Sequence, residues 1–234
     1  MRTAFSLIAF AVLAAAQPEL YSPLKQITPS NASRLTKAWQ FDSGDEFKGS
    51  EIQCRPLVID GVLYATTPKL RVVALDGASG KQLWSFDPFF GKPVTSKQRS
   101  RGFMHWNGRL YFGAGHQLFA LDRKTGQLVT EFGDNGRVDL RQGLGRDPET
   151  QRLQMTSPGV VYNDLLIVGF LTSEGLPSSP GDIRAFDART GKLRWSFHTI
   201  PHPGEPGYDT WPVDGWKTLG GANSWPGMAV DAKR

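Results

Sequence analysis

One short motif recurs along the chain and constrains its fold more than any other feature. Copies of the pattern Asp-x-x-(Thr/Ser)-Gly-(Lys/Gln) begin at Asp76, Asp122 and Asp187, and Asp122 follows Asp76 by 46 residues. Trp39 precedes Trp84 by 45 residues, which suggests an earlier, divergent unit. A period in the mid-forties is the length of a four-stranded propeller blade. The repeat therefore predicts radially arranged β blades.

A hairpin signal precedes each copy of the motif. Asp60-Gly61, Asn107-Gly108 and Asn163-Asp164 separate short apolar runs, and such dipeptides form the tight turns of antiparallel hairpins. No segment shows the 3.6-residue period of a helix. We predict an all-β fold: a partial β-propeller of four-stranded antiparallel blades, with about three blades and the start of another at 228–234.

Tryptophans follow the motif at a fixed distance in two copies. Trp84 and Trp195 lie four residues beyond the motif glycine, whereas the second copy carries Thr130 there. We expect both tryptophans to pack between neighbouring blades as core residues and not to form an active site. The packing next to Thr130 must differ.

The first residues indicate export. Met1-Arg2 supplies a positive start, 4–13 is apolar, and 14–16 is Ala-Ala-Ala before Gln17. This is the pattern of a signal peptide, and the apolar run is too short to span a bilayer. We predict a signal peptide over 1–16, a periplasmic mature chain over 17–234 and no membrane span. Cys54 is the single cysteine, so no internal disulfide supports the fold.

The charge does not indicate a nucleic-acid partner. The formal net charge is +5, but Lys and Arg are scattered through turn segments and form no basic stripe. We read them as solvated turn residues, with an anionic ligand as the second interpretation.

Extra length precedes the third copy, which starts 65 residues after the second. It falls in 132–154 and 171–181, and long loops on a rigid scaffold commonly carry ligand groups. Gly133-Asp134-Asn135-Gly136 lacks the spaced ligands of a calcium loop, so a plain turn is expected there.

From Ile27 onward the chain resembles the PQQ-dependent (quinoprotein) dehydrogenases, most closely the glucose-dehydrogenase-like branch. The stretches that carry the resemblance are Arg55-Pro56-Leu57-Val58, Arg101-Gly102-Phe103, Gly133-Asp134-Asn135-Gly136-Arg137-Val138-Asp139-Leu140, Thr156-Ser157-Pro158-Gly159, Gly181-Asp182-Ile183-Arg184-Ala185-Phe186-Asp187 and Gly220-Gly221-Ala222-Asn223-Ser224-Trp225. The resemblance implies eight blades in a complete ring, with PQQ and calcium as cofactors.

The resemblance also implies cofactor-binding residues. Trp225 matches the tryptophan on which the family stacks the quinone plane; it lies outside the Gly-x-x-x-Trp frame and before an expected strand from Met228 onward. Arg101 matches the arginine that pairs with quinone oxygens, where a forked guanidinium suits paired acceptors. Thr156 matches a hydroxyl donor, and Gln53 stands where many relatives have a glutamate.

For the metal, Glu174 matches a carboxylate that ligates calcium beside quinone oxygens, 18 residues after Thr156. The aspartate that acts as general base in the family has no match here, so we assign no catalytic residue to this chain. We expect the segment to be inactive alone and to be a truncated piece of a longer reading frame.

The resemblance thus implies an enzyme that transfers hydride from a sugar or alcohol to calcium-bound PQQ and passes electrons to ubiquinone or a cytochrome. The alternatives are a non-catalytic propeller that binds proteins at the cell envelope, and an inactive fragment. The joint presence of Arg101, Thr156, Glu174 and Trp225, without a lipid-anchor cysteine, favours the enzyme.

Overall fold

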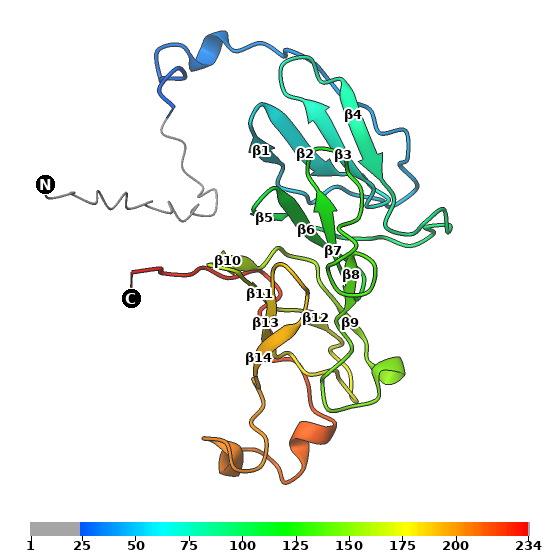
Figure 1. The fold of residues 1–234 in the computed structure, drawn as a ribbon, viewed down its shortest axis with the longest axis vertical. Coiled ribbons are helices and arrows are strands. Elements are labelled where there is room, and N and C mark those ends of the chain that lie inside the picture. Colours follow the sequence, from blue (N-terminus) through cyan, green and yellow to red (C-terminus); the bar gives the residue numbers. More distant parts are fainter. Residues whose placement is uncertain (1–23, 234) are drawn as a thin grey trace, which may run out of the picture.

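Three four-stranded antiparallel sheets follow one another along the molecule (Figure 1). This computed structural model describes residues 24–233; the predicted signal peptide lies outside the described residues. Each sheet is one propeller blade, with its strands adjacent in chain order. The fold class is therefore confirmed.

The first blade comprises β1 (Leu57–Ile59), β2 (Val62–Thr66), β3 (Val72–Asp76) and β4 (Gln82–Phe86). Its first hairpin has a two-residue turn, with Ile59 opposite Val62. Asp60 and Gly61 both have positive φ, 50° and 76°, as a turn matched to the strand twist requires. Asn107 and Gly108 repeat this geometry in the second blade.

The second blade comprises β5 (Met104–Trp106), β6 (Arg109–Ala114), β7 (Gln117–Asp122) and β8 (Arg137–Asp139). Its fourth strand, β8, begins further beyond the motif aspartate than the fourth strands of the other two blades do. After the motif turn the chain makes only an isolated bridge between Leu121 and Leu128, then loops outward before β8 pairs with β7. The predicted plain turn at 133–136 lies in this detour, where Gly136 N donates to Phe132 O at 2.8 Å.

The third blade comprises β10 (Val160–Tyr162), β11 (Leu165–Val168), β13 (Ile183–Asp187) and β14 (Leu193–Phe197). The inserted segments pair with each other through β9 (Leu153–Gln154) and β12 (Leu171–Thr172). The helical elements of the described residues are single 3-10 turns: Ala32–Arg34 (η1), Pro148–Thr150 (η2), Tyr208–Thr210 (η3) and Gly215–Lys217 (η4). Within 24–233, none of these helices has the length to cross a bilayer.

The repeated motif forms the same turn in each blade. In the first copy Asp76 Oδ1 accepts from Ser79 N at 2.8 Å, and Gly80 takes φ 73°. Asp122 and Asp187 accept from the equivalent amides of Thr125 and Thr190 at 2.9 Å. The local chemistry of the motif thus fixes the chain reversal that follows the third strand of each blade.

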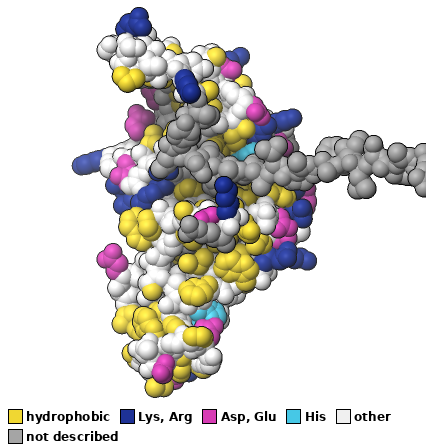
Figure 2. Space-filling model, turned by 90° about the vertical axis from the view of Figure 1, so that its left-hand side faces the viewer, with side chains coloured by type: hydrophobic (Ala, Val, Ile, Leu, Met, Phe, Trp, Pro, Cys, Tyr) yellow, Lys and Arg dark blue, Asp and Glu magenta, His cyan; other side chains and the backbone are white. Residues whose placement is uncertain are grey.

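The hydrophobic core lies largely between the blades. Side chains from the first and second blades form one buried cluster, which includes Tyr64, Val72, Phe112 and Phe119. A second cluster joins the second and third blades. On the side toward which β1, β5 and β10 lie, apolar side chains also reach the surface (Figure 2). The exposed ones in these inner strands are Val58 and Tyr162.

Two sequence expectations near the end of the chain were wrong. No strand forms from Met228 onward, because no strand of 24–233 hydrogen-bonds with it. Trp195 is 41% exposed and is not a core residue, since within the described chain no following turn glycine lies against it. Lys233 N does donate to Asp231 Oδ1 at 3.0 Å, as Lys124 N does to Asp122.

Candidate cofactor site

Three of the predicted site residues meet at one place. The Arg101 guanidinium lies over the Trp225 ring, 4.9 Å from its centroid, and its Nη1 donates to Thr156 Oγ1 at 2.9 Å. Thr156 is buried, whereas Trp225 is 43% exposed. A cation over an indole face is attracted by the ring quadrupole. The group therefore combines a cation, a hydroxyl and an accessible aromatic surface.

Backbone hydrogen bonds between successive blades hold Arg101 in place. Its amide donates to Thr156 O at 2.8 Å, and its carbonyl accepts from Arg55 N at 3.2 Å. Gly102 has φ 135°, and a Cβ there would lie 3.0 Å from Arg55 O. The Arg-Gly pair thus lets the chain pass close to the first blade while the arginine side chain turns toward Trp225.

Ser157 completes the group and was not singled out from the sequence. Its buried hydroxyl donates to Trp225 O at 2.6 Å and accepts from Arg101 Nη1 at 3.3 Å. Its position directly after Thr156 was the available signal, but the contact with Trp225 joins residues far apart in the chain. The serine links the backbone of the aromatic residue to the cation above it.

Gln53 does not join this group. It is exposed, and its Nε2 donates to Glu51 Oε1 at 2.6 Å. Glu51 also pairs with Lys97 at 2.5 Å and Arg99 at 3.2 Å, and the Lys97 hydrogen bond lowers the pKa of this carboxyl. Gln53 lies two residues before Arg55, whose amide bonds Arg101. Its role as a cofactor contact stays a prediction.

Glu174 is exposed in the loop after β12 and forms no hydrogen bond or ion pair with Arg101, Thr156 or Trp225. Within 24–233 no group of three or more His, Cys, Asp or Glu side chains is arranged to hold a metal ion. The calcium-ligand role of Glu174 is therefore also a prediction.

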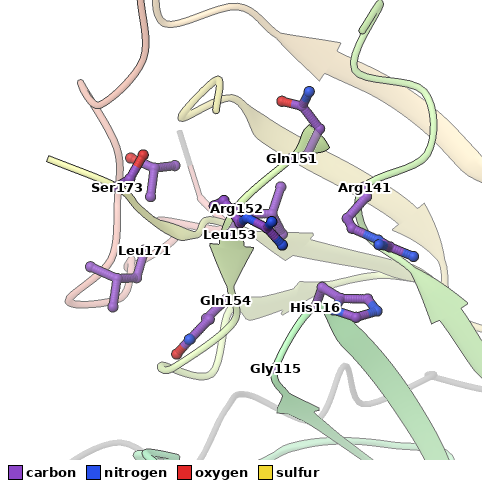
Figure 3. Close-up of a pocket in the computed structure, with 10 residues that line it drawn as sticks. Gly115, His116, Arg141, Gln151, Arg152, Leu153, Gln154, Leu171 and Ser173 are labelled. Atoms are coloured by element: carbon purple, nitrogen blue, oxygen red, sulfur yellow. The ribbon is translucent and has the colours of Figure 1, made fainter. Parts of the chain in front are cut away.

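A cleft of about 390 Å³ borders the loop that carries Glu174 (Figure 3). The Gly115–His116 turn, β9 and β12 form its walls, and Arg141 lies toward His116 on one side. Burial lowers the pKa of His116, and Arg141 is held by Asp139 at 2.7 Å. The cleft lining mixes polar and apolar side chains, and Asp139 largely balances the charge of Arg141.

Comparison with known proteins decides the family. The family described as "PQQ: Glucose/ethanol/alcohol dehydrogenase, beta-propeller domain" matches residues 12–234. The chain belongs to this family. This chain is 36% identical over 230 residues to the alcohol dehydrogenase (quinone) dehydrogenase subunit of Gluconacetobacter polyoxogenes, covering 90% of this chain and 30% of that one. It is 30% identical over 254 residues to quinoprotein glucose dehydrogenase A of Acinetobacter calcoaceticus, covering 91% and 30%.

A solved structure gives the same result for the fold. The quinohemoprotein alcohol dehydrogenase of Comamonas testosteroni superposes with a TM-score of 0.67 at 27% identity, covering 86% of this chain and 30% of that one. The chain thus spans about 30% of the length of these relatives. The predicted family is confirmed, and both alcohol and glucose dehydrogenases are among the relatives.

The described residues fit two requirements of PQQ, a planar tricyclic quinone with three carboxylates. Within 24–233 Arg101 forms no ion pair with a carboxylate, and its hydrogen bonds go to the hydroxyls of Thr156 and Ser157. A cation without an anionic partner beside an accessible indole suits a flat anion. Calcium is different, since it takes six to eight oxygen ligands and no cluster of three or more His, Cys, Asp or Glu side chains within 24–233 is arranged to hold it.

Proposed function

We propose that this chain supplies part of the PQQ-binding floor of a dehydrogenase that oxidises an alcohol or a glucose-like sugar. The observation that carries the proposal is the Arg101 guanidinium placed over the half-exposed Trp225 ring and hydrogen-bonded to Thr156. This chain covers about 30% of its relatives, so the activity of the whole protein belongs to the proposal.

In the proposed mechanism each residue has a distinct task. When bound, PQQ supplies an acceptor for the hydride that leaves the substrate C–H. Trp225 binds the quinone plane through its indole face, a large apolar surface with little rotamer freedom to lose. Arg101 binds anionic oxygens through its forked donors, and Thr156 fixes the orientation of Arg101 by accepting its hydrogen bond.

The finer parts of the proposal concern the metal, the acceptor and the compartment. Glu174 would supply one calcium ligand. Ubiquinone or a cytochrome would accept the electrons, and the chain would act in the periplasm after removal of residues 1–16. Each rests on the resemblance and, for export, on the apolar N-terminal run.

Titration of the purified chain with PQQ, followed by tryptophan fluorescence, tests the cofactor floor. We expect saturable quenching, with Trp225→Ala and Arg101→Ala each weakening affinity by roughly tenfold or more, equivalent to about 1.4 kcal/mol. Trp211→Ala and Lys192→Ala are matched controls, because both side chains are exposed outside the site. Equal affinity in all four variants, or no binding by the folded chain, would contradict the proposed floor.

The calcium proposal is tested in the same titration. If Glu174 is a ligand, calcium should tighten PQQ binding in the parent chain but not in Glu174→Gln. Glu46→Gln, another exposed carboxylate, should keep the calcium effect. A calcium effect that survives Glu174→Gln would assign the ligands elsewhere. If the chain is instead an envelope scaffold, PQQ should not bind with or without calcium.

A further inference from the structure

Trp225 lies on a segment without regular secondary structure. After η4 ends at Lys217, residues 218–227 form no strand and take part only in an isolated bridge between Pro180 and Gly221. A strand residue is held by its ladder, but this tryptophan is not. Its position therefore depends on individual tethers that bind the segment to the third blade.

Two tethers lie next to the tryptophan. Asn223 Nδ2 donates to Phe170 O at 2.7 Å, and Ser157 Oγ donates to Trp225 O at 2.6 Å. Gly169 allows close approach, since a Cβ there would lie 2.7 Å from Ser224 O. These contacts fix the segment at its end but not where it begins.

Arg146 binds the beginning of the segment. Its Nη2 donates to Leu219 O at 2.7 Å and also to Trp216 O, while its Nη1 donates to Ser178 O at 2.6 Å. Ser178 N in turn donates to Thr218 O at 3.0 Å. One guanidinium thus joins the loop after β8, the loop before β13 and the segment that leads to Trp225.

A second arginine holds the loop from which Arg146 extends. Arg184, fully buried on β13, donates from Nη1 to Leu140 O at 2.8 Å and from Nη2 to Gln142 O at 2.7 Å. Arg146 therefore projects from an anchored loop and not from a free one. The hydrogen bond from Arg146 to Leu219 therefore starts from a loop that Arg184 ties to β13.

The chemistry of this tether requires a guanidinium. The two terminal nitrogens of Arg146 donate to three carbonyl oxygens. The planar fork of guanidinium donors can reach all three, whereas the single ammonium group of a lysine cannot. Burial lowers the pKa of Arg146, and Asp182 partly compensates for that burial. A neutral replacement would leave carbonyls of the segment without their donor.

We propose that Arg146 is a positioning residue for the cofactor floor, acting through residues 218–224 to hold the Trp225 indole where PQQ binds. This inference rests on the proposed function for its meaning. The positioning itself concerns only the chain's own residues and can be measured without the cofactor.

The first measurement is fluorine NMR of the chain labelled with 5-fluorotryptophan, with the Trp225 resonance assigned by Trp225→Phe. We expect Arg146→Gln to shift or broaden the Trp225 resonance while that of Trp84, in the first blade, stays unchanged. Arg146→Lys should show a smaller change. Arg141→Gln is the matched control, since Arg141 lies in the same loop but bonds Asp139 and Glu149.

The second measurement is a double-mutant cycle on PQQ affinity. Arg146→Gln should weaken PQQ binding roughly tenfold in the parent chain and have little further effect in Trp225→Ala, because the two residues act through one contact. The cost of Arg146→Gln to unfolding stability should be similar in both backgrounds.

The outcomes separate the two proposals. An unchanged Trp225 resonance in a folded Arg146→Gln chain overturns the positioning role, as does an equal loss of PQQ affinity in both backgrounds. If the parent chain binds no PQQ, the proposed function fails, and the fluorine spectrum still decides the role of Arg146. If Arg146→Gln does not fold, the Arg146→Lys spectrum decides it.

Discussion

At the junction between the first and second blades a tryptophan packs against the motif glycine, and at the next junction no tryptophan takes that place. The Trp84 ring lies against Gly126 of the second motif turn, so closely that a Cβ there would be 2.4 Å from Cε3. At the next junction Gly133 N donates to Thr190 O at 2.9 Å, and a Cβ on Gly191 would be 2.9 Å from Gly133 N. The motif glycine is therefore needed because something from the preceding blade packs against it, whether an indole or a backbone.

Both junctions contain a hydrogen bond from a tyrosine hydroxyl to a backbone carbonyl of the next blade. Tyr64 OH donates to Arg123 O at 3.1 Å, and Tyr111 OH donates to Ala188 O at 2.6 Å. Both acceptors directly follow the motif aspartate. At the first junction Trp84 Nε1 also donates to Arg123 O, at 3.2 Å. At the second, Arg109 supplies the additional donor.

The largest expected difference between the junctions concerns the glycines. Gly191→Ala should cost about 3–5 kcal/mol of unfolding free energy, because a strained φ of 70° adds to a clash with backbone that cannot move aside. Gly126→Ala, with φ 71°, should cost about 2–4 kcal/mol, because an indole can shift. Urea unfolding measures both.

Gly61→Ala is the matched control for both variants. Its φ is 76°, and nothing lies within 4 Å of the added Cβ, so only the backbone strain of about 1–2 kcal/mol should appear. In a Trp84→Leu background Gly126→Ala should lose most of its extra cost. If Gly191→Ala lowers the unfolding free energy by no more than Gly61→Ala does, the backbone of Gly133 does not pack tightly against Gly191 at the second junction.

The next prediction compares the stability cost of truncating Trp84 and Thr130, which occupy the same position, four residues after the motif glycine, in the first and second copies of the motif. Trp84→Ala should cost about 3 kcal/mol, because it removes a partly buried ring and its hydrogen bond to Arg123. Thr130→Ala should change stability by less than about 0.5 kcal/mol, since Thr130 is exposed. Thermal unfolding measures both, and a large cost for Thr130→Ala would show that the junctions are closed alike.

The parts of the fold that could be predicted from sequence are those with local causes. Asp76, Ser79 and Gly80 form their turn through contacts within five residues, and Asp60-Gly61 forms its hairpin in the same way. Thr130 correctly indicated a different junction. The start of β8 at Arg137 could not be predicted, because pairing with β7 across the intervening segment 123–136 leaves no local pattern.

The site residues also fall into those that the sequence indicated and those that depend on contacts between distant segments. The family resemblance named Arg101, Thr156 and Trp225, and the structure brings them together. Ser157 and Arg146 were missed, because each acts on a segment about 70 residues away and neither lies in a repeating pattern. The expected strand at Met228 was wrong because strand formation depends on a partner as well as on composition.

The alkaline stability of the chain should report on the second junction. Burial raises the pKa of Tyr111 from 10.0 to about 12, so the folded state favours the protonated phenol. Its stabilising contribution is complete below pH 10 and is lost as pH rises toward 12, by about 2–3 kcal/mol. Tyr111→Phe should remove this part of the pH dependence in urea unfolding at several pH values. An identical alkaline slope in parent and variant would contradict it.

The smallest effect tests whether Arg109 replaces the missing indole donor. Its Nη1 donates to Arg189 O at 2.8 Å and Ala188 O at 3.4 Å, while its pairing with Glu131 is longer, at 3.5 Å, to a carboxylate that is 68% exposed. Arg109→Gln should therefore cost about 1 kcal/mol, the worth of a hydrogen bond across the junction, whereas Glu131→Gln should cost less than about 0.5 kcal/mol. Added salt should not change the unfolding free energy lost in Arg109→Gln, because salt screens a hydrogen bond to a backbone carbonyl far less than an exposed ion pair. Equal costs for the two variants, or a difference abolished by salt, would make Arg109 a surface ion-pair partner and leave the second junction without a side-chain substitute for tryptophan.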